Sequence, residues 1–129
     1  MATLTPTLTL ASTDAFSNQP ISLSVTDSLS IEAPMADVSK IAAATGGTVI
    51  TAASGSPITY FYLKHTGFLA ADGTTATTNL VTVSDAGGAA IATLGTGEFM
   101  WLPVAAGEGM KVTSATAAVF VEYAYFSKV

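Results

Sequence analysis

His65 is the only histidine in the chain, so a nucleophile activated by an imidazole base would have to use it. It ends the aromatic run Ile58 to His65 (ITYFYLKH) and is followed directly by Thr66-Gly67. No nucleophile-elbow motif accompanies it. A histidine at this place is typical of a surface or loop edge. We therefore expect no catalytic role for His65.

The nine carboxylates could act as general acids, bases or metal ligands, but they occur singly along the chain. Asp72 and Asp85 precede glycines in loops, where Asp is favoured because its side chain bonds nearby backbone N–H groups. Glu122 is the one charge within an apolar terminal strand, so it either pairs with Lys64 or Lys111 or faces solvent or a neighbouring subunit. We predict turn-forming and surface carboxylates.

Cofactor and metal sites are also not indicated. The chain has no cysteine, and a zinc site would have to combine His65 with carboxylates alone. No alternating Asp/Asn calcium loop is present. The glycine pairs Gly87-Gly88 and Gly95-Thr96-Gly97 lack the Lys-Ser/Thr of a phosphate-binding loop. The sequence predicts a protein that is not an enzyme and that has no cofactor, metal site or catalytic residues.

The composition limits the partners that the chain can bind. Of its 129 residues, 50% are hydrophobic and only 10% are charged, and the net charge is −5. The chain has no arginine and four scattered lysines, so it lacks the clustered cations that nucleic acid requires. The uncharged stretch 41–63 is interrupted by glycines and Pro57, which argues against a membrane span. A surface so poor in charge is typical of a subunit covered by neighbours.

The chain consists mainly of short runs of β-branched and aromatic residues that alternate with period two. Gly, Pro, Asp and Ser separate these runs. Turn signals every 8–12 residues predict an all-β fold with nine to eleven strands, a single-domain antiparallel β-sandwich of jelly-roll type. Residues 3–10 alternate Thr with Leu around Pro6, and residues 1–20 are expected to form an extended N-terminal arm or edge strand. Residues 21–129 are expected to form the sandwich.

Two segments of the first half are less regular. Residues 35–45 fit either a short amphipathic helix ended by Gly46-Gly47 or a strand, and we favour the strand. The sequence Ser54-Gly55-Ser56-Pro57 predicts a turn.

Aromatic residues gather on the runs 58–65, 98–104 and 117–126. Packing in the core is the simplest interpretation, because these runs are also the most apolar. Exposed Trp and Tyr could instead stack on sugar rings, so a carbohydrate-binding or receptor-binding module remains an alternative. Trp101 and Tyr125 are the candidates for interface anchors.

Four stretches carry a resemblance to a known group of proteins. They are the opening MATLTPTLTLASTDAFSNQPISLSVTDSLSI, the run TYFYLKHTG, the run IATLGTGEFMWLPV and the terminal VFVEYAYF. In this order they resemble small virion structural proteins of tailed phages, particularly phages of marine cyanobacteria. The resemblance implies a particle component without enzymatic activity.

The resemblance and the composition together lead to one functional expectation. We expect a capsid decoration or cement subunit that binds and stabilises the shell, and that is located in the virion after synthesis in the host cytoplasm. Its partners would be the major capsid protein or other virion proteins and further copies of itself, with no nucleic acid and no membrane. Leu4, Leu8 and Leu10 of the arm are the candidate contact residues. A tail- or fibre-associated structural subunit is the nearest alternative.

Overall fold

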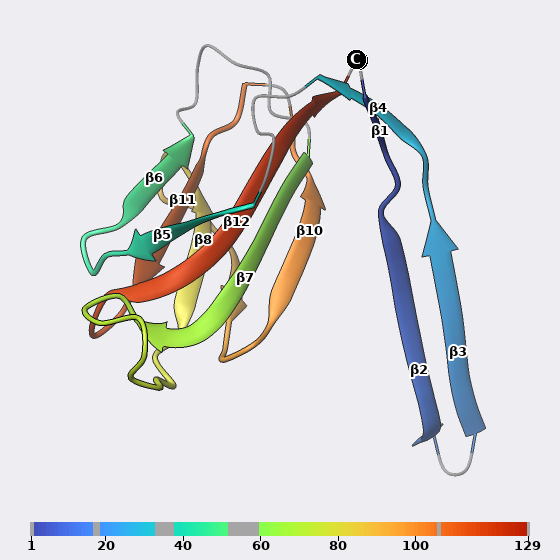
Figure 1. Cartoon of the computed structure of the whole chain (residues 1–129), viewed down its shortest axis with the longest axis horizontal. Helices are drawn as coiled ribbons and strands as arrows, with labels where there is room; N and C mark the ends of the chain where they lie inside the picture. Colours follow the sequence, from blue (N-terminus) through green and yellow to red (C-terminus); the bar gives the residue numbers. More distant parts are fainter. Residues whose placement is uncertain (1, 17–18, 33–37, 52–59, 106, 129) are drawn as a thin grey trace. The chain divides into compact units, whose positions relative to one another are not determined.

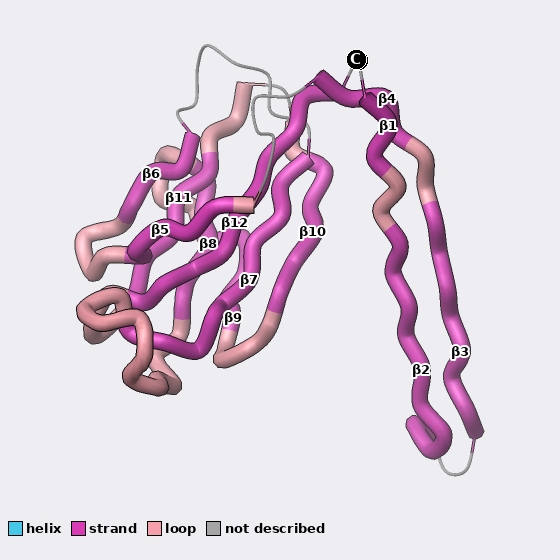
Figure 2. Tube along the Cα trace, viewed as in Figure 1, coloured by secondary structure: helices cyan, strands magenta, loops and turns pink. Residues whose placement is uncertain are grey.

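The computed structural model describes residues 2–16, 19–32, 38–51, 60–105 and 107–128. Within these residues the chain forms twelve β-strands and no helix (Figures 1 and 2). It divides into two units, one made of residues 1–32 with the last two residues and one made of residues 33–127. We call the described parts of the first unit the ribbon and those of the second the sandwich.

The sandwich consists of two four-stranded antiparallel sheets. The first sheet has the order β5 (Ser39–Ala43), β12 (Val119–Lys128), β7 (Tyr60–Leu69) and β10 (Phe99–Pro103). The second has the order β6 (Thr48–Thr51), β11 (Met110–Ser114), β8 (Val81–Asp85) and β9 (Ala90–Leu94). The prediction of an all-β sandwich is confirmed.

The strand pairing also explains why the sandwich is a jelly roll. The first of its eight strands pairs with the last (β5 with β12), the second with the seventh (β6 with β11), the third with the sixth (β7 with β10) and the fourth with the fifth (β8 with β9). This is one long antiparallel double strand, folded over so that successive pairs lie alternately in the two sheets. Eight strands connected in this way define the jelly-roll architecture.

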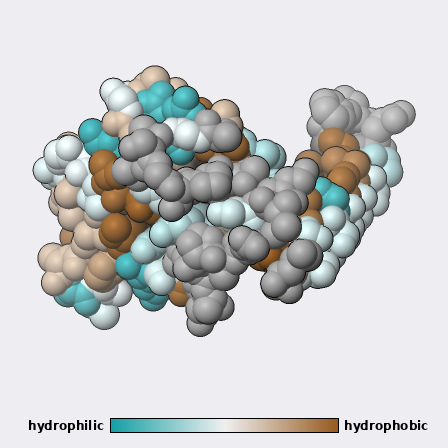
Figure 3. All heavy atoms as spheres, turned by 90° about the horizontal axis from the view of Figure 1, so that it is seen from above, coloured by the Kyte–Doolittle hydropathy of each residue, from teal (hydrophilic) through white to brown (hydrophobic). Residues whose placement is uncertain are grey.

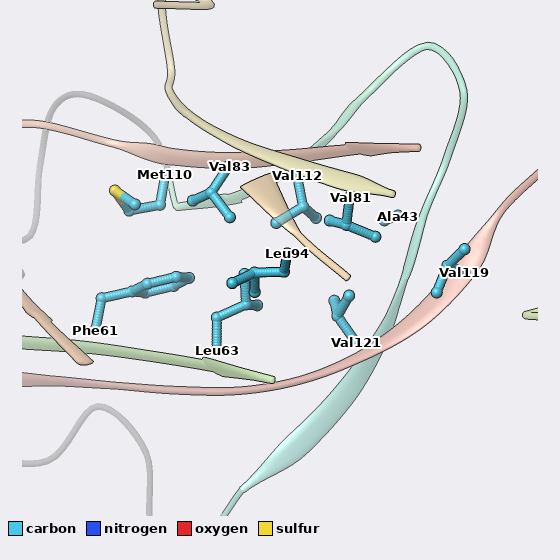
Figure 4. Packing of buried hydrophobic residues seen from close by; sticks show 10 residues of the cluster. All are labelled: Ala43, Phe61, Leu63, Val81, Val83, Leu94, Met110, Val112, Val119 and Val121. Carbon is cyan, nitrogen blue, oxygen red and sulfur yellow. The ribbon is translucent and has the colours of Figure 1, made fainter. Parts of the chain in front are cut away.

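The core lies between the two sheets and follows from the alternation of the strands. Phe61, Leu63 and Val121 of the first sheet point toward Val83 and Met110 of the second (Figure 4). Among the described residues, the buried cluster consists of Ala43, Phe61, Leu63, Val81, Val83, Leu94, Met110, Val112, Val119 and Val121. Because side chains alternate between the two faces of a strand, the residues between these positions lie on the outer faces of the sheets.

The ribbon is a two-stranded ladder in which β1 (Ala2–Leu4) and β2 (Thr7–Phe16) run antiparallel to β4 (Leu29–Glu32) and β3 (Gln19–Thr26). The register is the same on both sides of the interruption at Pro6, since Leu4 lies opposite Leu29 and Thr7 opposite Thr26. The N–H of Asp27 donates to the carbonyl of Pro6 across this interruption, at 3.1 Å. Pro6 itself has no N–H to donate, which explains why the strand is interrupted there.

The N-terminal unit is longer than the expected arm. The sequence placed a boundary after residue 20, whereas the structure divides the chain after residue 32 because β3 pairs with β2 rather than with a strand of the sandwich. The favoured strand within residues 35–45 corresponds to β5, and residues 35–37 lie outside the described part. The turn expected at 54–57 also falls outside it.

Candidate interaction surfaces

His65 lies in the middle of β7 and is completely buried, so the expected position at a surface or loop edge was wrong. The strand continues past it to Leu69 because Gly67 adopts a positive φ of 86° and allows a bulge opposite Val119 to Val121. The N–H of Gly67 donates to Nδ1 of His65 at 2.9 Å, and Nε2 lies 2.7 Å from the carbonyl of Asn79. Nδ1 therefore accepts while Nε2 donates, so the ring is neutral and both nitrogens are engaged in structural hydrogen bonds.

Asp72 and Asp85 form turns, as expected. Asp72 accepts hydrogen bonds from the hydroxyl and N–H of Thr75 and from the N–H of Thr74, and these bonds lower the pKa of its carboxyl group from 3.8 to about 2. Asp85 accepts a hydrogen bond from the N–H of Ala89 at 2.9 Å in the turn between β8 and β9. In the described part of the chain, no three His, Cys, Asp or Glu residues are grouped so that they could hold a metal ion.

Glu122 lies on the outer face of the first sheet, because Val121 and Tyr123 on either side of it pack toward the core. The hydroxyl of Tyr62 donates to its Oε1 at 3.1 Å. Burial, followed by this hydrogen bond, raises the pKa of the Tyr62 hydroxyl. Lys64 is directly opposite Glu122 in the ladder, while Lys111, the other partner considered from the sequence, belongs to the second sheet.

Trp101 and Tyr125 lie on opposite faces of the first sheet. Tyr125 is half-buried and packs against the core, with its ring stacked on Tyr123 at 6.3 Å between centroids. Trp101 is half-buried on the outer face, and its ring stacks on Tyr60 with centroids 5.5 Å apart and planes 9° apart. Of the two expected anchors, only Trp101 therefore faces outward. The nearby Phe99 has the most exposed large hydrophobic side chain among the described residues, at 62%.

The ribbon has one apolar face formed by cross-strand pairs. Leu8 lies opposite Val25, and Leu10 lies opposite Leu23. Their exposed fractions are 45%, 53%, 48% and 43% respectively. Paired residues share a face of the ladder, so these four side chains form one exposed aliphatic surface, which we call the ribbon face. Leu4 is half-buried opposite Leu29 on the neighbouring β1.

Sequence reasoning found half of the ribbon face. Leu8 and Leu10 were expected to be contact residues, whereas Leu23 and Val25 fall within residues 21–129, which were assigned to the sandwich. The alternation of hydrophobic residues over 20–27 was the available signal. It shows which side chains share a face but not which strand lies beside them.

On the face seen in Figure 3, the described residues carry few strongly hydrophilic groups. On the ribbon, an open hollow of about 520 Å³ is lined by Ala11, Ser12, Thr13, Pro20, Ile21 and Ser22. This lining supplies hydroxyl and aliphatic groups but no carboxylate, imidazole or amine. Within the described residues, no helix has the length and hydrophobicity to span a membrane.

Compared with known proteins, the chain matches no family model, no curated protein and no solved structure.

Proposed function

We propose that the protein is a non-enzymatic structural subunit of a phage particle, a capsid decoration subunit that binds the shell through the ribbon face. The observation that carries this proposal is the exposure of Leu8, Leu10, Leu23 and Val25 on a two-stranded element. These residues are about half exposed, although they are all large and aliphatic.

The physical argument is that a two-stranded ribbon is not stable without support. An isolated hairpin is marginal in water, and a sheet with one apolar face normally buries that face against a second layer. The ribbon has the pattern of such a sheet, with Thr7, Thr9, Ser24 and Thr26 on the opposite, polar face. A partner surface would provide the missing layer.

A particle suits such a partner because it presents many identical sites. Each ribbon face offers four large side chains, so a single contact is weak, but repeated contacts between subunits on one shell add through avidity. The low charge of the chain fits a surface that is covered in the assembly. Jelly rolls serve as viral capsid domains, although the same architecture also occurs in lectins and cupins, so the fold alone does not select the function.

The test replaces the ribbon face without removing the ribbon. We expect the combined variant Leu8→Thr, Leu10→Thr, Leu23→Thr and Val25→Thr to lose occupancy on shells assembled from the major capsid protein of the same phage. Threonine keeps the β-branched shape that strands favour while it removes the aliphatic contact. Occupancy is measured by co-sedimentation of the subunit with shells.

A matched control changes two equally exposed side chains of the sandwich. Val49 and Ile91 are 51% and 48% exposed, so Val49→Thr with Ile91→Thr makes the same chemical change elsewhere on the chain. We expect this variant to bind shells as the unmodified protein does. Full occupancy by the ribbon variant would refute attachment through the ribbon face.

Cryo-electron microscopy of native particles would distinguish a position on the capsid from one on the tail or a fibre.

A second candidate function is carbohydrate binding on the outer face of the first sheet. It is favoured by the outward Trp101, the exposed Phe99 and the neighbouring pair of Tyr62 and Glu122, since aromatic rings stack on sugars and polar groups bond their hydroxyls. In that case, binding on a glycan array should disappear in Trp101→Ala and persist in the ribbon variant. Absence of glycan binding by the unmodified protein would exclude it.

A further inference from the structure

The ribbon has a free edge along β2. Among the described residues, β2 and β3 pair as a sheet of two strands. The N–H of Asp27 donates to the carbonyl of Pro6, and hydrogen-bonded positions alternate along an antiparallel ladder. Leu8 and Leu10 therefore direct their backbone N–H and C=O groups toward β3, whereas Thr7, Thr9 and Ala11 direct theirs toward the free edge.

A side-chain contact supports this assignment. Residues at non-hydrogen-bonded positions of an antiparallel pair have the closer side chains. The hydroxyl oxygens of Thr7 and Thr26 lie 3.1 Å apart, as expected for such a position. The outward groups of Thr7, Thr9 and Ala11 thus form a regular row of donors and acceptors.

This edge differs from the edges of the sandwich. β5 and β10 end the first sheet, β6 and β9 end the second, and all four are only four or five residues long. β10 ends in Pro103, and shifts of register interrupt the pairing of β6 and of β9. Short strands, proline and bulges are the devices by which proteins prevent edges from pairing. β2 has ten residues without proline or lysine, and its register with β3 is unbroken from Thr7 to Ser12, so this part of the edge lacks these protections; the shift of register lies beyond it, between Ser12 and Phe16.

We propose that β2 pairs with β2 of a second copy of this chain, antiparallel and about a two-fold axis at Thr9. Thr9 would then exchange hydrogen bonds with Thr9 of the second copy, and Thr7 with Ala11 of the second copy. Leu8 would lie beside Leu10 of the second copy on the same face. The product is a four-stranded sheet whose aliphatic face is twice the ribbon face.

The sequence of β2 favours its own copy as the partner. Near a two-fold axis each residue meets its own counterpart, so a charged residue there would be repelled by its copy. The segment from Thr7 to Thr13 has no charge, and the Thr/Leu alternation from Thr7 to Leu10 keeps leucine opposite leucine when the segment pairs with itself about Thr9. Three or more strands with a hydrophobic face are needed for a stable small sheet, and four strands meet this requirement.

This inference rests on the proposed function in one respect, since the doubled face would be the surface that meets the shell.

The test of the pairing uses proline at the two free edges of the ribbon. Thr9→Pro removes an outward N–H from β2 and keeps the ladder between β2 and β3 intact. Ser24→Pro makes the same change at the residue opposite Thr9, on the outer edge of β3, and is the matched control.

We expect the unmodified protein to show a monomer–dimer equilibrium in sedimentation velocity. Thr9→Pro should raise the dissociation constant of the dimer at least about tenfold, because it removes the central hydrogen bonds of the pairing and leaves their partners unsatisfied. Ser24→Pro should leave the constant unchanged. The near-ultraviolet circular dichroism of the stacked Tyr60 and Trp101 reports whether each variant keeps a folded sandwich.

Three results would overturn the inference. The unmodified protein could stay monomeric at all concentrations, or the Thr9→Pro variant could dimerise normally. In the third, Ser24→Pro loses the dimer while Thr9→Pro keeps it. Shell occupancy is measured separately. A dimer that does not bind shells refutes the proposed function and leaves the pairing in place. A monomer that binds shells refutes the pairing and leaves the proposed function in place.

Discussion

The ribbon and the sandwich are built from the same kind of alternating strand, but they treat their apolar faces differently. In the sandwich, Leu63 and Val121 are fully buried against the second sheet. In the ribbon, Leu8 and Leu10 remain about half exposed. The sandwich therefore contains both layers of its own core, whereas the β2–β3 part of the ribbon contains one. Alternation thus specifies an apolar face, and the cover for this face can come from within the chain or from outside it.

The largest effect should separate the two units directly. Leu63→Ala should lower the free energy of unfolding by about 3 kcal/mol, because it removes a fully buried side chain and leaves a cavity. Leu10→Ala should change the free energy of unfolding of the isolated protein by less than about 1 kcal/mol, because that side chain is already half in water. Urea unfolding followed by circular dichroism measures both. Equal losses would show that the ribbon is as fully packed as the sandwich.

The second effect concerns the buried polar group of the sandwich. His65→Ala should lower the free energy of unfolding by about 2–3 kcal/mol, because it leaves the N–H of Gly67 and the carbonyl of Asn79 without their partner in a dry site. Thermal and urea unfolding measure the loss. His65→Gln, which keeps one donor and one acceptor, should recover part of it. A neutral His65→Ala variant would contradict the structural role that its hydrogen bonds indicate.

The third effect tests the bulge that carries β7 past His65. Gly67→Ala should cost about 1–2 kcal/mol from its positive φ, and more from the new Cβ, which would lie 3.0 Å from Cγ2 of Thr96. Gly88→Ala is the control, because Gly88 also has a positive φ but has no atom within 4 Å of the added Cβ. The difference between their unfolding midpoints isolates the contact. Identical midpoints would show that Thr96 moves aside freely.

Much of the sandwich could be predicted from sequence because its strands are separated by clear turn chemistry. Asp85 to Gly88 and Gly95 to Gly97 mark the ends of β8, β9 and β10 within a residue or two. The period of two along the last strand likewise separates Val121 and Tyr123 from Glu122, and the structure has the first two on the core side.

The errors arose where pairing, rather than alternation, decides the structure. His65 appeared to end its strand because Thr66-Gly67 has the composition of a turn, but Gly67 forms a bulge and the strand continues to Leu69. The strand at 19–26 looked like part of the sandwich, yet it pairs with β2. Register between distant strands depends on packing that a single sequence does not display.

The smallest effect is a surface one and concerns pH. Hydrogen bonds from Thr75 and Thr74 lower the pKa of Asp72 to about 2, so its ionised form is stabilised in the folded protein relative to the unfolded chain. This contribution is fully present above the unfolded value near 3.8 and is lost as the pH falls toward 2. Asp72→Asn should therefore unfold more easily than the unmodified protein at pH 6, and this difference should shrink between pH 4 and pH 2.

Melting temperatures across this pH range provide the measurement for Asp72, and Glu108→Gln controls for the loss of one exposed negative charge. The loop that holds Asp72 joins β7 to β8 within the sandwich. If the sandwich unfolds independently of the ribbon, the four threonine substitutions in the ribbon should leave both its melting temperature and this pH-dependent difference unchanged. A melting temperature of the sandwich that falls with those substitutions would mean that ribbon and sandwich unfold as one cooperative unit, and the contrast between a self-sufficient sandwich and a dependent ribbon would fail.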